Sequence, residues 1–144
     1  MPHNSTIFDF IDKKGTFIVK NPGRFNLYFP LTDKNGSLLS CISPNLSGDI
    51  KSDNDHFLTV PASVLDLKYN LLCRREFYLK ADNRYIRFSL SDKNDLLEAG
   101  LLYHKLTKRK HGLKIEITNF IPYDAGVEIM QVKVTNESKS PLDI

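Results

Sequence analysis

Hydrophobic and polar positions alternate most regularly between residues 113 and 118, where every odd position is Leu or Ile and every even position is polar. A period of two is typical of a β-strand with one buried face. Two further strand-like runs, at 97–106 and 127–136, flank this one, and turn-forming segments at 107–112 and 122–126 connect them. The pattern therefore predicts three consecutive strands joined as a β-meander.

The third of these runs changes the phase of its apolar positions. Val127 and Ile129 are at odd positions, whereas Met130, Val132 and Val134 are at even ones. Two explanations are open: a β-bulge near residues 129–130, or protein covering both faces of the strand at that point.

The first two thirds of the chain contain many short strand candidates and almost no helical periodicity. An Asn-Gly pair at 35–36 predicts a hairpin, residues 81–84 predict another turn, and residues 43–54 form a long polar loop with at most short strands. Only 61–67 and 91–96 could hold a helical turn. The predicted strands lie at 16–19, 24–30, 38–42, 57–60, 75–79 and 85–90.

This arrangement predicts an all-β, antiparallel β-sandwich, with residues 1–144 forming one domain. A hydrophobic fraction of 41% and a charged fraction of 26% are those of a soluble globular protein. The formal net charge of +3 indicates no particular partner. Because the first residues lack the features of a secretion signal, we expect a cytoplasmic protein in which Cys41 and Cys73 are reduced thiols.

Few residues suggest catalysis. The aspartates of the polar loop lie in turn-like sequence, where Asp has a conformational use, and neither the histidines nor the cysteines have metal-binding spacing. We therefore predict no catalytic residue and no metal ligand. His104 is expected to be a hydrogen-bonded strand residue. The basic segment 105–111 is expected to form a hairpin tip, which is either a solvated turn or a contact for nucleic-acid phosphates, and we favour the turn.

Several short motifs, in order along the chain, resemble the N-terminal β-sandwich domain of family 94 glycoside phosphorylases. This family includes cellobiose phosphorylase, chitobiose phosphorylase, β-1,2-oligoglucan phosphorylase and part of cyclic β-1,2-glucan synthase. The resemblance is closest to the branch that acts on β-1,2-glucans. The motifs are YFPL (28–31), ISPN (42–45), GDIK (48–51), FLTVP (57–61), Arg75 with Phe77 and Tyr78, EAGLLYHK (98–105), ITNFIP (117–122), VEIMQV (127–132), and Thr135 with Asn136.

The resemblance implies a supersandwich fold of the galactose-mutarotase type, possibly present only in part. It also implies that the chain is an N-terminal piece of a larger enzyme, followed by an (α/α)6 barrel that holds the catalytic acid and uses inorganic phosphate as co-substrate. No other cofactor is expected. The chain departs from the family in having no Trp, with Tyr78 and Tyr103 at positions where the family often has one.

Two functions remain open for such a domain. In the first, it is a non-catalytic part of a phosphorylase acting on β-linked gluco-oligosaccharides, associates with the barrel and forms homo-oligomers. In the second, it is a stand-alone carbohydrate-binding module or an assembly domain, for which Tyr28, Tyr78, Tyr85 or Tyr123 would have to line one face. We expect neither nucleic acid nor membrane as a partner. Candidate substrate-binding residues are Asn45, Asp49, Lys51, Arg75 and His104.

Overall fold

The computed structural model describes residues 7–63, 65–66 and 75–144, which form three antiparallel sheets. The six-stranded sheet contains, in spatial order, β1 (Asp9–Phe10), β2 (Phe17–Lys20), β8 (Leu96–Gly100), β9 (Tyr103–Lys110), β10 (Leu113–Phe120) and β11 (Ile129–Asn136). The three-stranded sheet contains β3 (Phe29–Thr32), β4 (Leu39–Ile42) and β5 (Ile50–Lys51). The third sheet is the hairpin of β6 (Tyr78–Ala81) and β7 (Arg84–Arg87), and a short 3-10 helix spans Pro22–Arg24.

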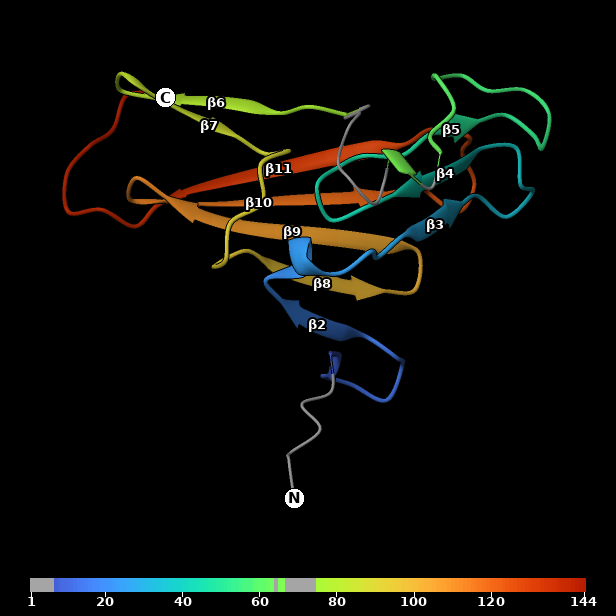
Figure 1. The fold of residues 1–144 in the computed structure, drawn as a ribbon, viewed down its shortest axis with the longest axis horizontal. Coiled ribbons are helices and arrows are strands. Elements are labelled where there is room, and N and C mark those ends of the chain that lie inside the picture. Colours follow the sequence, from blue (N-terminus) through green and yellow to red (C-terminus); the bar gives the residue numbers. More distant parts are fainter. Residues whose placement is uncertain (1–6, 64, 67–74) are drawn as a thin grey trace.

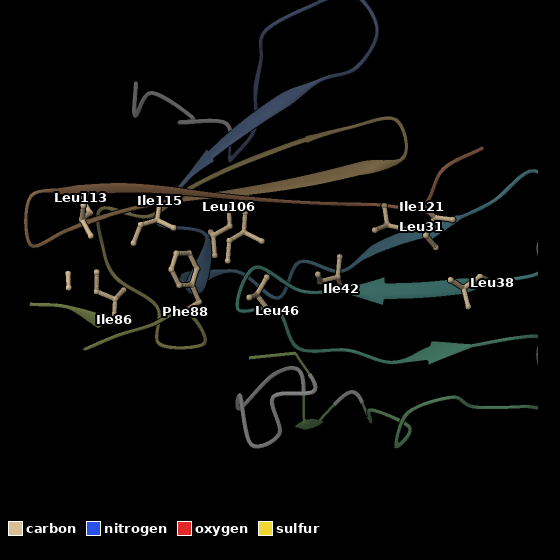
Figure 2. Packing of buried hydrophobic residues seen from close by; sticks show 12 residues of the cluster. Leu31, Leu38, Ile42, Leu46, Ile86, Phe88, Leu106, Leu113, Ile115 and Ile121 are labelled. Carbon is tan, nitrogen blue, oxygen red and sulfur yellow. The ribbon is translucent and has the colours of Figure 1, made fainter. Parts of the chain in front are cut away.

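These sheets form the two layers of a sandwich (Figure 1). The core lies between them, with side chains from the six-stranded sheet on one side and side chains from the two smaller sheets and their loops on the other (Figure 2). Leu106, Ile115 and Ile117 belong to the first group, and Ile42 and Ile86 to the second. All five are at most 1% exposed, so the two layers are held together mainly by burial of apolar surface. The all-β antiparallel sandwich predicted from the sequence is confirmed.

The alternation that predicts the central strand is confirmed in β10. Leu113, Ile115 and Ile117 are buried in the core, whereas the intervening Lys114 and Glu116 lie on the opposite face and form an ion pair of 2.9 Å. The strand pairs along its whole length with β9 on one side and β11 on the other. A strand with two neighbours and one apolar face has only one favourable register, because a shift of one residue would bury its charged residues.

The single strand predicted at 97–106 is divided between two strands in the structure. The run 97–106 is divided by a turn at Leu102, which has a φ of 64°, so it forms the end of β8 and the start of β9. The loop predicted at 107–112 is wrong, because β9 continues to Lys110. The hairpin turn consists of His111 and Gly112, both with positive φ, as a tight two-residue connection requires.

The phase change in the third run has a simpler explanation than either alternative. β11 begins at Ile129, so Val127 lies outside the strand. Its register with β10 is unbroken from Ile129, opposite Phe120, to Asn136, opposite Leu113, and contains no bulge. The even residues Met130, Val132 and Val134 pack against the core, and the other face of the strand is more exposed.

In the first part of the chain, the hairpin predicted at Asn35-Gly36 joins β3 to β4, and the turn predicted at 81–84 joins β6 to β7. The strand predicted at 24–30 was placed too early, because Pro22–Arg24 is a 3-10 helix and β3 begins only at Phe29. The strand predicted at 57–60 is reduced to an isolated bridge between Lys51 and Phe57. The helical turn predicted at 61–67 lies partly outside the described residues, as does Cys73. Cys41 is a free thiol.

Among the described residues, no helix is long and apolar enough to cross a membrane.

Candidate functional site

Aromatic side chains from three segments surround an open hollow of about 450 Å³, which we call the aromatic hollow. The rings of Phe8 and Phe17 meet edge to face, with centroids 4.9 Å apart. Phe17 also lies 6.0 Å from Phe10 and 6.0 Å from Phe29. The residues lining the hollow are Phe8, Phe10, Phe17, Asn26, Leu27, Tyr28 and Phe29.

Strand pairing brings these rings together. β1 pairs with β2 so that Phe10 is directly opposite Phe17, and the alternation of side chains along this segment places Phe8 on the same side as Phe10. The 3-10 helix at Pro22–Arg24 then leads the chain to Tyr28 and Phe29 at the start of β3. Phe10 is 69% exposed and Tyr28 is 41% exposed, so both rings are accessible to a ligand.

Polar groups lie at the edge of the hollow. Asn26 is in its lining, and the Tyr28 hydroxyl lies 3.5 Å from Oδ1 of the buried Asp49. Asp49 also accepts a 3.0 Å hydrogen bond from the backbone N–H of Ala62 through Oδ2. Burial, together with neighbouring Cys41 and Asp49, raises the pKa of the Tyr28 phenol, so it stays protonated and able to donate a hydrogen bond.

A buried polar cluster lies behind Phe29. The His104 ring is 5.4 Å from the Phe29 ring and is fully buried, and its Nδ1 is 3.4 Å from the Asn119 amide nitrogen. Among the described residues, His104 Nε2 and Asn119 Oδ1 have no hydrogen-bond partner. Burial lowers the pKa of His104 to about 4, and the positive charge of Arg75 contributes to the shift, so the imidazole is neutral near pH 7.

Arg75 is the cationic member of this cluster. Its guanidinium donates to both carboxylate oxygens of Glu128, at 2.6 and 2.8 Å, and to the Ser40 hydroxyl at 2.7 Å. Arg75 and Glu128 are 8% and 9% exposed. The bidentate contact ties the segment before β6 to the segment before β11, and it provides a buried charge with a buried counter-charge.

The five residues that the sequence predicts to bind substrate have different roles in the structure. Asp49 supports the Tyr28 wall of the hollow, and His104 supports the Phe29 wall. Arg75 acts on His104 electrostatically. Asn45 stabilises the buried turn 43–47, where its Oδ1 accepts hydrogen bonds from the Ser43 hydroxyl and the Ser47 backbone N–H.

Lys51 is separate from this group. It lies on β5, with its Nζ 5.4 Å from the centre of the Phe57 ring, and it does not line the hollow.

The residues predicted from the sequence do not include the rings of Phe8, Phe10 and Phe17, or the buried partners Asn119 and Glu128. A signal for the first group was present, because Phe8 and Phe10 are two residues apart and would share one face of a strand. No comparable signal exists for Asn119 and Glu128, since polar residues are usually exposed.

The predicted basic hairpin tip is wrong. Lys108 is 2% exposed and forms a 2.6 Å ion pair with Asp95, which is 4% exposed. Lys105 pairs with Glu98 at 2.6 Å on the outer face of the six-stranded sheet, and the exposed Arg109 pairs with Glu137 at 3.3 Å. Most of the expected positive charge is therefore neutralised by neighbouring carboxylates.

The exposed tyrosines do not line one common face. Tyr78 and Tyr85 lie on the hairpin of β6 and β7, where Arg87 stacks 5.8 Å from the Tyr78 ring centre. Tyr28 lies in the aromatic hollow instead. A single aromatic platform made of these residues is therefore absent from the described part of the chain.

Comparison with known proteins finds a match to one family model. The model of the supersandwich domain of glycosyl hydrolase 94 matches residues 90–144. The matched segment contains β8 to β11, which form most of the six-stranded sheet. No curated protein matches the chain. Residues 90–144 are thus similar to the supersandwich domain of glycosyl hydrolase family 94, the family that the sequence motifs resemble.

Proposed function

We propose that the chain is the non-catalytic N-terminal supersandwich domain of a family 94 glycoside phosphorylase acting on β-linked gluco-oligosaccharides. The family match over residues 90–144 carries this proposal. In the parent enzyme, an (α/α)6 barrel supplies the catalytic acid and inorganic phosphate is the co-substrate. The role of this domain is then to position the barrel and to hold part of the oligosaccharide. Residues 1–144 form a single domain in this proposal.

The aromatic hollow is the part of the domain that we assign to the sugar. A pyranose ring has apolar C–H faces and polar hydroxyl edges, so it fits a concave site with aromatic walls and a few polar groups. Phe10 and Tyr28 offer accessible ring faces, and the Asn26 amide offers both a donor and an acceptor. Asp49 and His104 act indirectly, because both are buried behind the tyrosine and phenylalanine walls.

Titration with β-linked gluco-oligosaccharides, followed by amide NMR, tests this assignment. We expect shifts concentrated at the residues of the hollow, and we expect Phe10→Ala and Tyr28→Ala each to weaken binding about tenfold or more, since ring stacking and area burial are both lost. Tyr85→Ala is the matched control, because Tyr85 is 68% exposed on β7 and does not line the hollow. Unchanged amide shifts, or equal loss with Tyr85→Ala, would refute the assignment.

A further inference from the structure

His104 on β9 and Asn119 on β10 form a polar pair inside the sandwich. They are directly opposite each other in the strand register, and both residues are 0% exposed. The next pair on the same face is Leu106 with Ile117, which is wholly apolar. Because polar groups buried without partners destabilise a fold, a polar pair at this depth requires an explanation.

The pair offers one hydrogen-bond donor and one acceptor. If the Asn119 amide donates to His104 Nδ1 across the 3.4 Å between them, the proton of the neutral imidazole is on Nε2. Among the described residues, Nε2 of His104 and Oδ1 of Asn119 then have no partner. With the amide turned over the roles exchange, and one donor and one acceptor again remain. A hydroxyl group both donates and accepts, so it matches the pair in either orientation.

Phe29 separates this pair from the aromatic hollow. Its ring centroid lies 5.4 Å from that of His104, and the ring also lines the hollow. In this position His104 acts on the hollow only through the phenylalanine ring. Phe29 is half-buried at the first position of β3, beside an open volume of about 450 Å³. A change of its χ1 rotamer toward that volume would connect the pair with the hollow.

The charges around the pair favour a neutral ligand group. The His104 imidazole is uncharged near pH 7 because burial lowers its pKa to about 4. The guanidinium of Arg75 donates to both carboxylate oxygens of Glu128. Because this charge is already compensated, the pair is better matched to a neutral hydroxyl than to an ion.

We propose that His104 and Asn119 form an inner subsite for the primary hydroxyl of a glucose residue in the aromatic hollow, reached when the Phe29 ring turns aside. This inference rests on the proposed function. The primary hydroxyl extends further from a glucopyranose ring than the other hydroxyls and rotates about its own C–C bond. It can therefore pass Phe29 while the sugar ring stays against Phe10 and Tyr28 of the hollow.

The inner subsite makes the hollow selective. A sugar without the primary hydroxyl would leave the buried donor and acceptor unpaired, and a site built to bind a hydroxyl discriminates against such an analogue for this reason. Glucose residues are thus preferred over pentoses and over deoxy sugars that lack this group.

The ring nitrogen shifts of His104 test whether the sugar reaches the pair. They are followed by NMR during titration with a β-linked glucose trisaccharide, and the signal is assigned by its loss in His104→Gln. We expect Nε2 to shift together with the amides that line the hollow, because it gains a hydrogen-bond partner. If the amides shift and Nε2 does not, the inner subsite is overturned and the sugar assignment stands. If neither shifts, the sugar assignment itself fails, and the subsite with it.

An analogue of the trisaccharide whose residues lack the primary hydroxyl identifies the group that is bound. Isothermal titration calorimetry should show that the unsubstituted protein binds this deoxy analogue at least about tenfold more weakly than the glucose trisaccharide. Equal affinities would overturn the proposal, because the pair would then not select this hydroxyl.

The double variant His104→Leu/Asn119→Leu separates recognition from support of the Phe29 wall. Replacing both polar partners by apolar side chains is close to neutral for stability, so we expect a folded protein. It should bind the two trisaccharides equally, whereas loss of mere support would weaken both and preserve the preference. A preference that survives in the double variant would thus contradict the subsite.

Thr107→Val is the matched control. Thr107 is a buried polar residue on the opposite face of β9, and its replacement should leave the preference for the glucose trisaccharide unchanged. If the double variant does not fold, the ring nitrogen shifts and the deoxy analogue still decide between the two outcomes.

Discussion

The ammonium group of Lys108 lies 2.6 Å from the Asp95 carboxylate, and the two side chains are only 2% and 4% exposed. Lys108 also donates a 2.9 Å hydrogen bond to the Leu90 carbonyl and lies 5.7 Å from the centre of the Phe88 ring. Burial raises the pKa of Asp95 even though Lys108 opposes the shift. The pair thus ties β9 to the segment before β8 inside the sandwich.

Replacing Lys108 with Met should lower the free energy of unfolding by about 3–5 kcal/mol at pH 7, because the buried carboxylate loses its counter-charge. The loss should shrink as the pH falls, since a carboxyl group with a raised pKa takes up a proton more readily in the native state than in the unfolded state. Urea denaturation followed by circular dichroism at several pH values measures both effects.

Lys114→Met is the control for this experiment. Lys114 pairs with Glu116 on the outer face and should contribute less than about 1 kcal/mol. Equal losses for the two lysine variants would contradict the assigned role of the buried pair.

His104 should make the protein less stable as the pH falls from about 6.5 to about 4. In this range the unfolded histidine binds a proton and the buried native histidine does not, so protonation favours the unfolded state. The full effect is of order 3 kcal/mol. His104→Gln should flatten this pH dependence of the unfolding free energy. A slope unaffected by His104→Gln would contradict the prediction.

Glu128 should be essential to the fold through Arg75. Glu128→Gln keeps the shape but removes the counter-charge of a buried guanidinium, so we expect a loss of about 2–5 kcal/mol in chemical denaturation. Glu137→Gln, which alters the exposed 3.3 Å pair with Arg109, should change stability by less than about 1 kcal/mol. A similarly small loss for Glu128→Gln would show that Arg75 does not depend on this carboxylate.

Gly48 should tolerate no side chain. A Cβ at this position would lie 1.9 Å from the Cys41 carbonyl oxygen, and the residue has a φ of +130°. Gly48→Ala should therefore cost more than about 4 kcal/mol or prevent folding, because only backbone movement could relieve the clash. Gly36→Ala is the control. Its φ of +66° brings strain of about 1–2 kcal/mol, but its Cβ would meet open space. Comparable thermal stabilities of the two variants would refute the prediction.

The sequence by itself determined the fold class, the central strand β10 and the hairpin at Asn35-Gly36. These depend on local signals: the period-two alternation of apolar residues, and the ability of Asn and Gly to adopt positive φ. The family resemblance came from the same local motifs, and the family match supports it over residues 90–144.

Only the tertiary structure decided the location of charged and polar residues relative to the core. Lys108 follows the alternation of His104 and Leu106 and so faces inward, which is favourable only because Asp95 lies beside it. A sequence does not reveal that partner, because the two residues meet across strands. The aromatic hollow depends in the same way on the pairing of β1 with β2 and on the approach of Tyr28 and Phe29. Local patterns determine which face of a strand is apolar, whereas contacts between distant segments determine which polar groups can be buried and where a site forms.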